Sequence, residues 1–226
     1  MEMYSDRNQD CWYKEVCLAD MSLCNRNCIK FMEIQHLMET SGLPKARQCP
    51  QQLIAPDWDL EAYTRLAEIK DGIVNFVEQG KNLYIASGMS GNGKTSWAIK
   101  LLLRYFDQIW SGNGFNTRGL FISVPTFLLK AKDFKHTDEE FERLKRNILK
   151  ADLVIWDDIA STTMSAYDYS QILVYLDNRL LAKQSNIYTG NFPTVDMLSE
   201  RVGTKVASRI FSHDTEVITF KGGDMR

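Results

Sequence analysis

Short apolar runs and longer, helically spaced apolar sets alternate along most of the chain. The short runs, rich in β-branched and aromatic residues, predict β-strands over 83–86, 120–124, 153–156, 187–189 and 217–220. The spaced sets predict helices over 66–77 (ended by Gly80), 95–106, 141–148 and 167–182. Strands that alternate with helices are typical of βαβ units. We therefore expect an α/β fold with a central parallel sheet covered by helices.

The cysteines mark a change in composition along the chain. All five, at positions 11, 17, 24, 28 and 49, lie within the first 49 residues. Pro44, Pro50 and Pro56 predict an extended or turn-rich connector in the same region. We therefore divide the chain into a small Cys-rich module with its linker, residues 1–55, and a main domain, residues 56–226.

Composition excludes several classes of protein. Of the 226 residues, 44% are hydrophobic, which is enough to bury a core and excludes wholesale disorder. No apolar stretch approaches the roughly 20 residues of a membrane-spanning helix, so we expect no membrane partner. The polar, acidic beginning of the chain does not resemble a signal peptide, and we expect a cytoplasmic protein. A net charge of −2 argues against bulk nucleic-acid coating but allows a local basic groove.

The sequence after the first predicted strand matches the phosphate-loop pattern G-x-x-x-x-G-K-[ST] in full. Its residues are Gly88, Met89, Ser90, Gly91, Asn92, Gly93, Lys94 and Thr95. Glycines let backbone N–H groups curl around phosphate oxygens, and the following helix directs its positive dipole end at the same anion. Lys94 brings a positive charge to the β- and γ-phosphates, and the Thr95 hydroxyl binds Mg²⁺. The motif predicts a nucleotide site; an ordinary glycine-rich turn is the alternative.

Two acids, Asp157 and Asp158, follow the predicted strand 153–156. A carboxylate at the end of a buried strand can hold the Mg²⁺ shell, a role we assign to Asp157. Asp158 can orient or activate the attacking water. The alternative is that both acids only solvate the strand end. Because the chain contains no N-K-x-D stretch to read guanine, we expect ATP as the nucleotide.

In this order, the motifs resemble the DnaC/DnaI-type replicative helicase loaders and their transposition relative IstB, within the AAA+ ATPases. The resemblance covers about Tyr84 to Arg226 and implies an AAA+ P-loop ATPase fold. Thr189-Gly190-Asn191 is similar to the family's strand-end Thr-x-Asn, which implies that Asn191 senses the γ-phosphate or positions water; a plain turn residue is the alternative. The family usually has Asp-Glu where this chain has two aspartates, and the shorter Asp158 implies slow turnover.

The resemblance also implies roles for arginines late in the chain. Residues 203–210 are similar to the family's G-x-R-x-x-x-R segment, which makes Arg209 an arginine finger for a neighbouring subunit's ATP. Lys205 stands where the family usually has the first arginine. The end of the chain resembles the family's G-x-x-x-R and makes Arg226 a second sensor. A finger implies an ATP-dependent oligomer. The alternatives are a surface cation for Arg209 and a frayed end for Arg226, while Arg179 is either interfacial or on a solvated helix face.

Single-stranded DNA contacts are implied by the same resemblance, at an aromatic before the acidic motif and a Ser-x-aromatic pair after it. Ungapped counting places them at Phe134 and at Ser165 with Tyr167. Aromatic rings stack on bases of any sequence. Residues 126–150 hold seven Lys or Arg against five Asp or Glu, a net charge of only +2. Ordinary packing of both aromatics is the alternative.

Cys11, Cys17, Cys24 and Cys28 could hold Zn²⁺ through four thiolates, although only the last pair has the short spacing typical of zinc sites. A metal would stabilise a module too small to fold well alone. Buried free thiols are the alternative, and a helix is expected over 28–39. DnaI-type loaders have an N-terminal zinc-bearing module that docks on the helicase, which implies the same role for residues 1–55.

Together these features predict an ATP-dependent loader that binds a replicative hexameric helicase and single-stranded DNA during replication initiation. An IstB-like ATPase that assists a transposase has nearly the same motifs and remains an alternative. A small-molecule P-loop kinase is a second alternative, although no lid insertion follows the acidic motif. A nucleotide-binding adaptor that never hydrolyses ATP is a third, because Asp158 replaces the usual glutamate.

Overall fold

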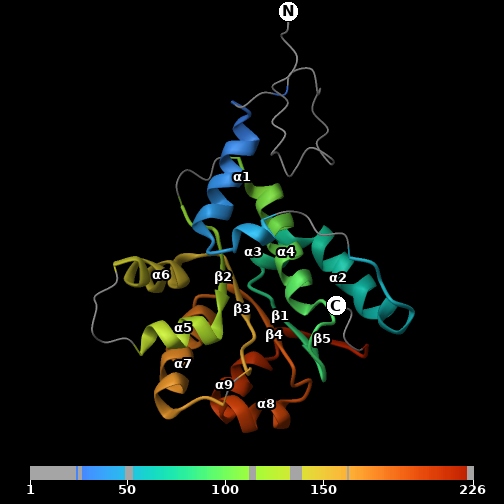
Figure 1. The fold of residues 1–226 in the computed structure, drawn as a ribbon, viewed down its shortest axis with the longest axis vertical. Helices are drawn as coiled ribbons and strands as arrows, with labels where there is room; N and C mark the ends of the chain where they lie inside the picture. Colours follow the sequence, from blue (N-terminus) through green and yellow to red (C-terminus); the bar gives the residue numbers. More distant parts are fainter. Residues whose placement is uncertain are drawn as a thin grey trace, which may run out of the picture.

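Five parallel strands form the single sheet of the computed structural model (Figure 1). The structure describes residues 24, 27–48, 53–111, 116–132, 139–161 and 163–222. The strands are Asn82–Ser87 (β1), Gly119–Ser123 (β2), Leu153–Asp157 (β3), Ser185–Gly190 (β4) and Thr215–Phe220 (β5). Their order across the sheet is β2-β3-β4-β1-β5, and every neighbouring pair is parallel. The predicted α/β fold with a central parallel sheet is therefore confirmed.

Helices cover both faces of this sheet (Figure 1). One face carries Ile29–Thr40 (α1), Leu60–Asp71 (α2), Ile73–Glu78 (α3) and Lys94–Ile109 (α4). The other carries Val124–Ala131 (α5), Glu139–Lys150 (α6), Ala166–Leu181 (α7), Val195–Val202 (α8) and Thr204–Ile210 (α9). Alternate residues of each strand enter the two cores, as in β1, where Leu83 and Ile85 face α4 and Tyr84 faces the opposite layer. None of the helices in the described residues is long and apolar enough to cross a membrane.

The helices differ from the predicted ones in two respects. The segment predicted as one helix over 66–77 is two helices, because Gly72 interrupts it between α2 and α3. Three helices, α5, α8 and α9, were not predicted. Each has eight residues or fewer, so its apolar pattern spans barely two turns and gives little helical periodicity.

The N-terminal helix α1 packs on the same core as the sheet. Its buried residues Ile34, Leu37 and Met38 belong to the cluster that contains α4. An ion pair of 2.7 Å joins Lys30 of α1 to Asp107 of α4. Residues from 29 onward therefore share a core with the main domain, and the predicted division near residue 55 stays a prediction.

Arg179 of α7 is completely buried, which corrects the expectation of an interfacial or solvent-exposed side chain. Its guanidinium donates to the backbone carbonyls of Ile148, Ala151 and Ser185 at 2.6–2.7 Å, and to Asn186 Oδ1 at 2.7 Å. Burial lowers its pKa to about 10. The guanidinium thus ties α7 to the end of α6 and the start of β4, which is a structural role.

We predict that Arg179→Ala lowers the free energy of unfolding by about 3–5 kcal/mol, because several buried carbonyl groups lose their donor at once. Arg146→Ala, on the exposed surface of α6, is the control and should cost less than about 0.5 kcal/mol. Urea denaturation followed by circular dichroism measures both. Equal stability of the two variants would contradict the structural role.

Candidate nucleotide-binding site

The phosphate loop, residues 88–93, connects the carboxyl end of β1 to the start of α4. This is the strand–loop–helix context that the motif requires. Gly91 and Gly93 have φ angles of 80° and 89°, a left-handed conformation that residues with a Cβ rarely adopt. Such a backbone allows loop N–H groups to curl around an anion, and the start of α4 adds the positive end of its helix dipole, so the loop suits a phosphate.

Lys94 and Asn92 hydrogen-bond within the loop. The Lys94 ammonium donates to Met89 O and to Asn92 Oδ1, both at 2.8 Å, and the side chain is nearly buried. The Asn92 amide donates to the hydroxyl of Ser87 and, at 3.4 Å, to Gly222 O. Both of these acceptors are neutral oxygens, so neither cancels the positive charge of Lys94, which can attract an anionic ligand.

The Asp157 carboxylate, at the end of β3, accepts two hydrogen bonds on one oxygen. Thr95 Oγ1 donates to Asp157 Oδ1 at 2.8 Å, and Thr189 Oγ1 donates to the same atom at 2.7 Å. The Thr189 hydroxyl also accepts from the backbone N–H of Asp158 at 3.0 Å. This N–H belongs to a residue with a φ of 56°, so the backbone turns sharply just after Asp157. The start of α4 and the ends of β3 and β4 therefore meet at one carboxylate.

Burial raises the pKa of Asp157 above its ordinary value. The two threonine hydroxyls and the positive charge of Arg47 act in the opposite direction, and the charge of Asp158 adds to the rise. Burial dominates because Asp157 is only 8% exposed and, among the described residues, its carboxylate forms no ion pair. A carboxylate that is costly to ionise when alone gains correspondingly more from a cation.

The residues around Asp157 fit a magnesium ion that is shared with phosphates. Mg²⁺ prefers oxygen ligands and is usually bound by one or two carboxylates together with phosphate oxygens of the substrate. Asp157 and the Thr95 hydroxyl provide such oxygens beside the phosphate loop. In the described part of the chain no three His, Cys, Asp or Glu gather at one place. A metal here would therefore depend on the nucleotide for most of its ligands.

Asn191 lies just after β4, on the strand that neighbours both β1 and β3. Its Oδ1 atom is buried, and no hydrogen-bond partner for it occurs among the described residues. Nearby, Tyr84 of β1 donates to Phe192 O at 2.9 Å and fixes this loop against the sheet. A buried amide with an unused acceptor is costly. It therefore suits a group that meets water or a ligand.

Arg209 lies on α9, on the layer of helices opposite α4. Its guanidinium donates to Asp177 Oδ1 of α7 at 2.6 Å, and its side chain is 39% exposed. Lys205 is exposed one turn earlier on the same helix. The predicted finger is therefore on the surface of a protomer, where it can meet another chain, and a surface cation remains the alternative.

Ser165 and Tyr167, the pair predicted to contact DNA, both form hydrogen bonds within the protein. Ser165 is the N-cap of α7 and forms a capping box with Asp168. Tyr167, which is half-buried, donates through its hydroxyl to Ala131 O at 2.7 Å, so the ring lies between α7 and the end of α5. Lys132 pairs with Asp168 at 2.8 Å beside it. Phe134, the third predicted DNA contact, lies outside the described residues.

Other predicted positions are also outside the described part of the chain. They are Arg226, the expected second sensor, and the zinc-ligand candidates Cys11 and Cys17. Cys24 is half-buried and Cys28 is exposed, and neither forms a disulfide in the described residues. These two cysteines lend the four-cysteine zinc site no support, and it stays a prediction.

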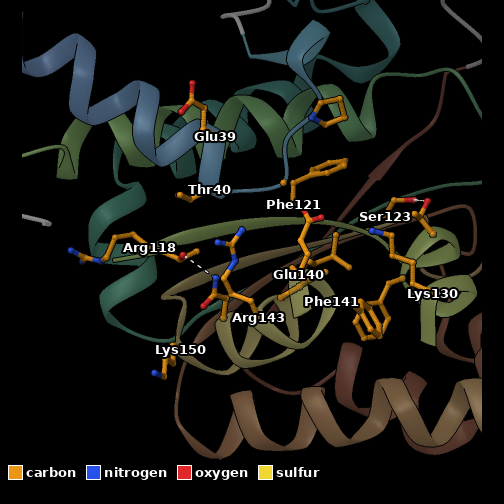
Figure 2. A pocket seen from close by; sticks show the side chains of 18 of the residues that line it. Glu39, Thr40, Arg118, Phe121, Ser123, Lys130, Glu140, Phe141, Arg143 and Lys150 are labelled. Carbon is orange, nitrogen blue, oxygen red and sulfur yellow. Dashed lines mark hydrogen bonds between the residues drawn. The ribbon is translucent and has the colours of Figure 1, made fainter. Parts of the chain in front are cut away.

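A hollow of about 1060 Å³ opens along the free edge of β2, between α1 and α6 (Figure 2). Thr40 comes from α1, Phe121 from β2, and Arg143 and Lys150 from α6. None of the residues lining the hollow belongs to the phosphate loop, and Asp157 is also absent from its lining. The hollow and the candidate nucleotide site are therefore separate.

Two residues of the site were not found from the sequence. Thr189 lies in the predicted Thr-x-Asn segment, but only Asn191 received a role there. Arg47, in the single turn Lys45–Arg47 (η2), donates to Ser96 Oγ at 3.4 Å although 49 positions separate the two residues. The period-2 pattern of a parallel strand could have suggested that Thr189 faces inward. No local pattern could have suggested Arg47.

No family model matches the sequence, and no curated protein does. Solved structures do match. The crystal structure of the DnaC helicase loader has a TM-score of 0.62 at 19% identity, over 75% of this chain and 94% of that chain. The crystal structure of DnaI has a TM-score of 0.60 at 18% identity, over 81% of this chain and 94% of that chain.

A third match is the replication initiator DnaA bound to AMPPCP and single-stranded DNA, with a TM-score of 0.55 at 16% identity. It covers 75% of this chain and 49% of DnaA, so the present chain spans about half of that protein. At these identities the matches establish the fold. The chain has the AAA+ P-loop fold of the DnaC/DnaI-type loaders, as its motifs predicted.

We predict that Asp157→Asn stabilises the nucleotide-free protein at pH 8. A carboxyl whose pKa is raised by folding contributes stability below its unfolded pKa and loses it as the pH rises through the folded value. The neutral amide avoids this loss. A gain of about 1 kcal/mol in the free energy of unfolding corresponds to a rise of about 2–4 °C in the midpoint temperature.

The measurement is the midpoint temperature of thermal unfolding in EDTA at pH 4 and pH 8. Glu200→Gln, which neutralises an exposed acid of α8 outside the site, is the control and should follow the wild type. The difference in midpoint temperature between Asp157→Asn and wild type should widen from pH 4 to pH 8. A gap that stays constant or narrows would show that the buried carboxylate does not titrate as described.

Proposed function

We propose that the chain is an ATP-dependent AAA+ helicase loader that acts in replication initiation. The observation that carries the proposal is the contact of Thr95 with Asp157 beside the Lys94 loop, on a fold shared with DnaC and DnaI. The loop binds the phosphates of ATP through its N–H groups and Lys94. Adenine is preferred over guanine because the sequence has no guanine-reading stretch.

Hydrolysis follows from positioning and charge. Thr95 and Asp157 would hold Mg²⁺, which would neutralise charge on the β- and γ-phosphates. The Asp158 carboxylate and Asn191 Oδ1, which has no hydrogen-bond partner among the described residues, would orient the attacking water, since they directly follow the neighbouring strands β3 and β4. A carboxylate one methylene shorter than glutamate reaches the water less well, so we expect slow turnover.

Arg209 completes the site of a neighbouring subunit in this proposal. The ion pair with Asp177 holds the guanidinium on the protomer surface, and a pair this exposed contributes only about 0–1 kcal/mol. The γ-phosphate of a neighbouring ATP, with more negative charge and bidentate geometry, can therefore displace Asp177. ATP would then bind at the junction of two subunits and drive the assembly of copies.

Single-stranded DNA is the second proposed ligand. Ser165 and Tyr167 lie at the start of α7, next to the end of α5, with Lys130 and Lys132 on the same helix end. The Tyr167 ring can stack on a base, and the lysines can meet phosphates. The DnaA structure named above contains single-stranded DNA on the same fold, which makes such a ligand reasonable for this chain.

We predict that Arg209→Ala binds ATP as wild type does and hydrolyses it at least about tenfold more slowly, as expected when an arginine finger is lost. The sharper test is complementation. Lys94→Ala abolishes its own site but keeps its finger, so an equal mixture with Arg209→Ala should regain part of the lost ATPase rate. Phosphate release measures the rate, and Arg146→Ala is the control.

If the mixture stays inactive, Arg209 does not act across subunits. If Arg209→Ala alone retains the wild-type rate, the finger assignment is wrong.

For DNA, we predict that Tyr167→Ala weakens binding of a fluorescent oligo-dT by about 1–3 kcal/mol, whereas Tyr167→Phe retains most of it. The ring makes the proposed stacking contact, whereas the hydroxyl donates to Ala131 O. Fluorescence anisotropy at fixed salt gives both affinities. A purely structural tyrosine would give the same DNA affinity in all three proteins.

The partner is tested by mixing the chain with its cognate replicative hexameric helicase, with and without ATP. Light scattering after chromatography should give an ATP-sensitive complex with several copies per hexamer, and Lys94→Ala should lose the sensitivity to ATP. Absence of any complex under both conditions would contradict the loader function and leave only the nucleotide site.

A further inference from the structure

We infer that Arg47 binds the phosphates of the nucleotide within the same chain, and so couples the N-terminal segment to nucleotide binding. The inference deepens the proposed function, on which it rests. Arg47 does not belong to the phosphate loop or to the predicted finger and sensors, and it comes from the segment between α1 and α2.

The position of Arg47 is fixed by two contacts of the chain around it. On one side, Ser41 O accepts from Phe121 N of β2 at 2.7 Å, so the end of α1 is tied to the free edge of the sheet. On the other side, the η2 turn closes through Arg47 N to Pro44 O at 2.8 Å. The segment 41–47 therefore runs from the edge of β2 to the start of the phosphate helix α4.

At that point the guanidinium meets the first turn of α4. Arg47 Nη1 donates to Ser96 Oγ at 3.4 Å, and Ser96 directly follows Thr95. Arg47 thus lies beside the first turn of the helix that follows the phosphate loop, next to the residue that comes directly after Thr95.

The arginine has no acidic partner within 4 Å among the described residues. Among the described residues, its guanidinium donates one long hydrogen bond, which goes to the neutral hydroxyl of Ser96. A phosphate oxygen would give a shorter, charge-assisted bond with bidentate geometry. The side chain is exposed, so it is free to turn from Ser96 to an arriving anion at little cost.

This contact has a consequence for the N-terminal segment. α1 shares the core of α4, and Pro44 lines the hollow at the β2 edge. When Arg47 binds the phosphates, the segment 41–47 is held by the nucleotide as well as by its hydrogen bond to β2. The region before residue 48, which carries the proposed helicase-docking module, is then held more firmly in the ATP-bound protein than in the empty one.

The test compares ATP affinity, by calorimetry in Mg²⁺, for the full-length wild type and three variants. Arg47→Ala should weaken ATP binding about tenfold or more, and Arg47→Lys should retain part of the lost affinity. Lys45→Ala removes an exposed cation from the same turn and should bind like wild type. Equal weakening in Lys45→Ala would indicate a general charge effect and overturn the inference.

A second readout is amide hydrogen exchange over residues 41–48. In wild type, ATP should slow this exchange; in Arg47→Ala at saturating ATP, it should not. If wild type binds no ATP, the proposed nucleotide site itself fails. If wild type and Arg47→Ala bind ATP equally and show the same exchange, only the role of Arg47 fails.

Discussion

The buried carboxylate of Asp157 is the point on which the candidate site depends. One of its two oxygens accepts hydrogen bonds from the hydroxyls of Thr95 and Thr189. These bonds join the start of α4 to the ends of β3 and β4. In a parallel sheet these ends converge on one edge, and the order β2-β3-β4-β1-β5 places β4 between the acid strand and the loop strand. The threonine on β4 is therefore the residue that can bridge them.

The same carboxylate explains why the site suits a cation and an anion together. Burial opposes its ionisation, while Lys94 nearby keeps a positive charge inside the loop. Each charge is costly alone, and a Mg²⁺–triphosphate complex compensates both. Binding energy at such a site is thus available for moving the elements attached to it, which include α4 and the segment that holds Arg47.

Sequence reasoning succeeded where the signal was local. The strands, the long helices and the loop from Gly88 to Thr95 are encoded by periodicity and by adjacent residues, and the structure contains them. It failed where the determinant was distant in the chain. From the sequence, Arg179 is expected on a helix surface, but in the fold it is surrounded by carbonyl groups of α6 and β4. Arg47 is expected in a linker, but in the fold it lies beside Ser96. A role that would depend on a second chain, such as the one proposed for Arg209, leaves no trace within one protomer.

The central claim is that Asp157 and the phosphate loop bind nucleotide and Mg²⁺ as one unit. Calorimetric titration of ATP into wild type and Asp157→Asn, each with Mg²⁺ and with EDTA, tests it directly. The account predicts tight binding for wild type only with Mg²⁺, and weak binding for Asp157→Asn that no longer responds to the metal. Equal Mg²⁺ dependence in the two proteins, or no ATP binding by wild type, would contradict it.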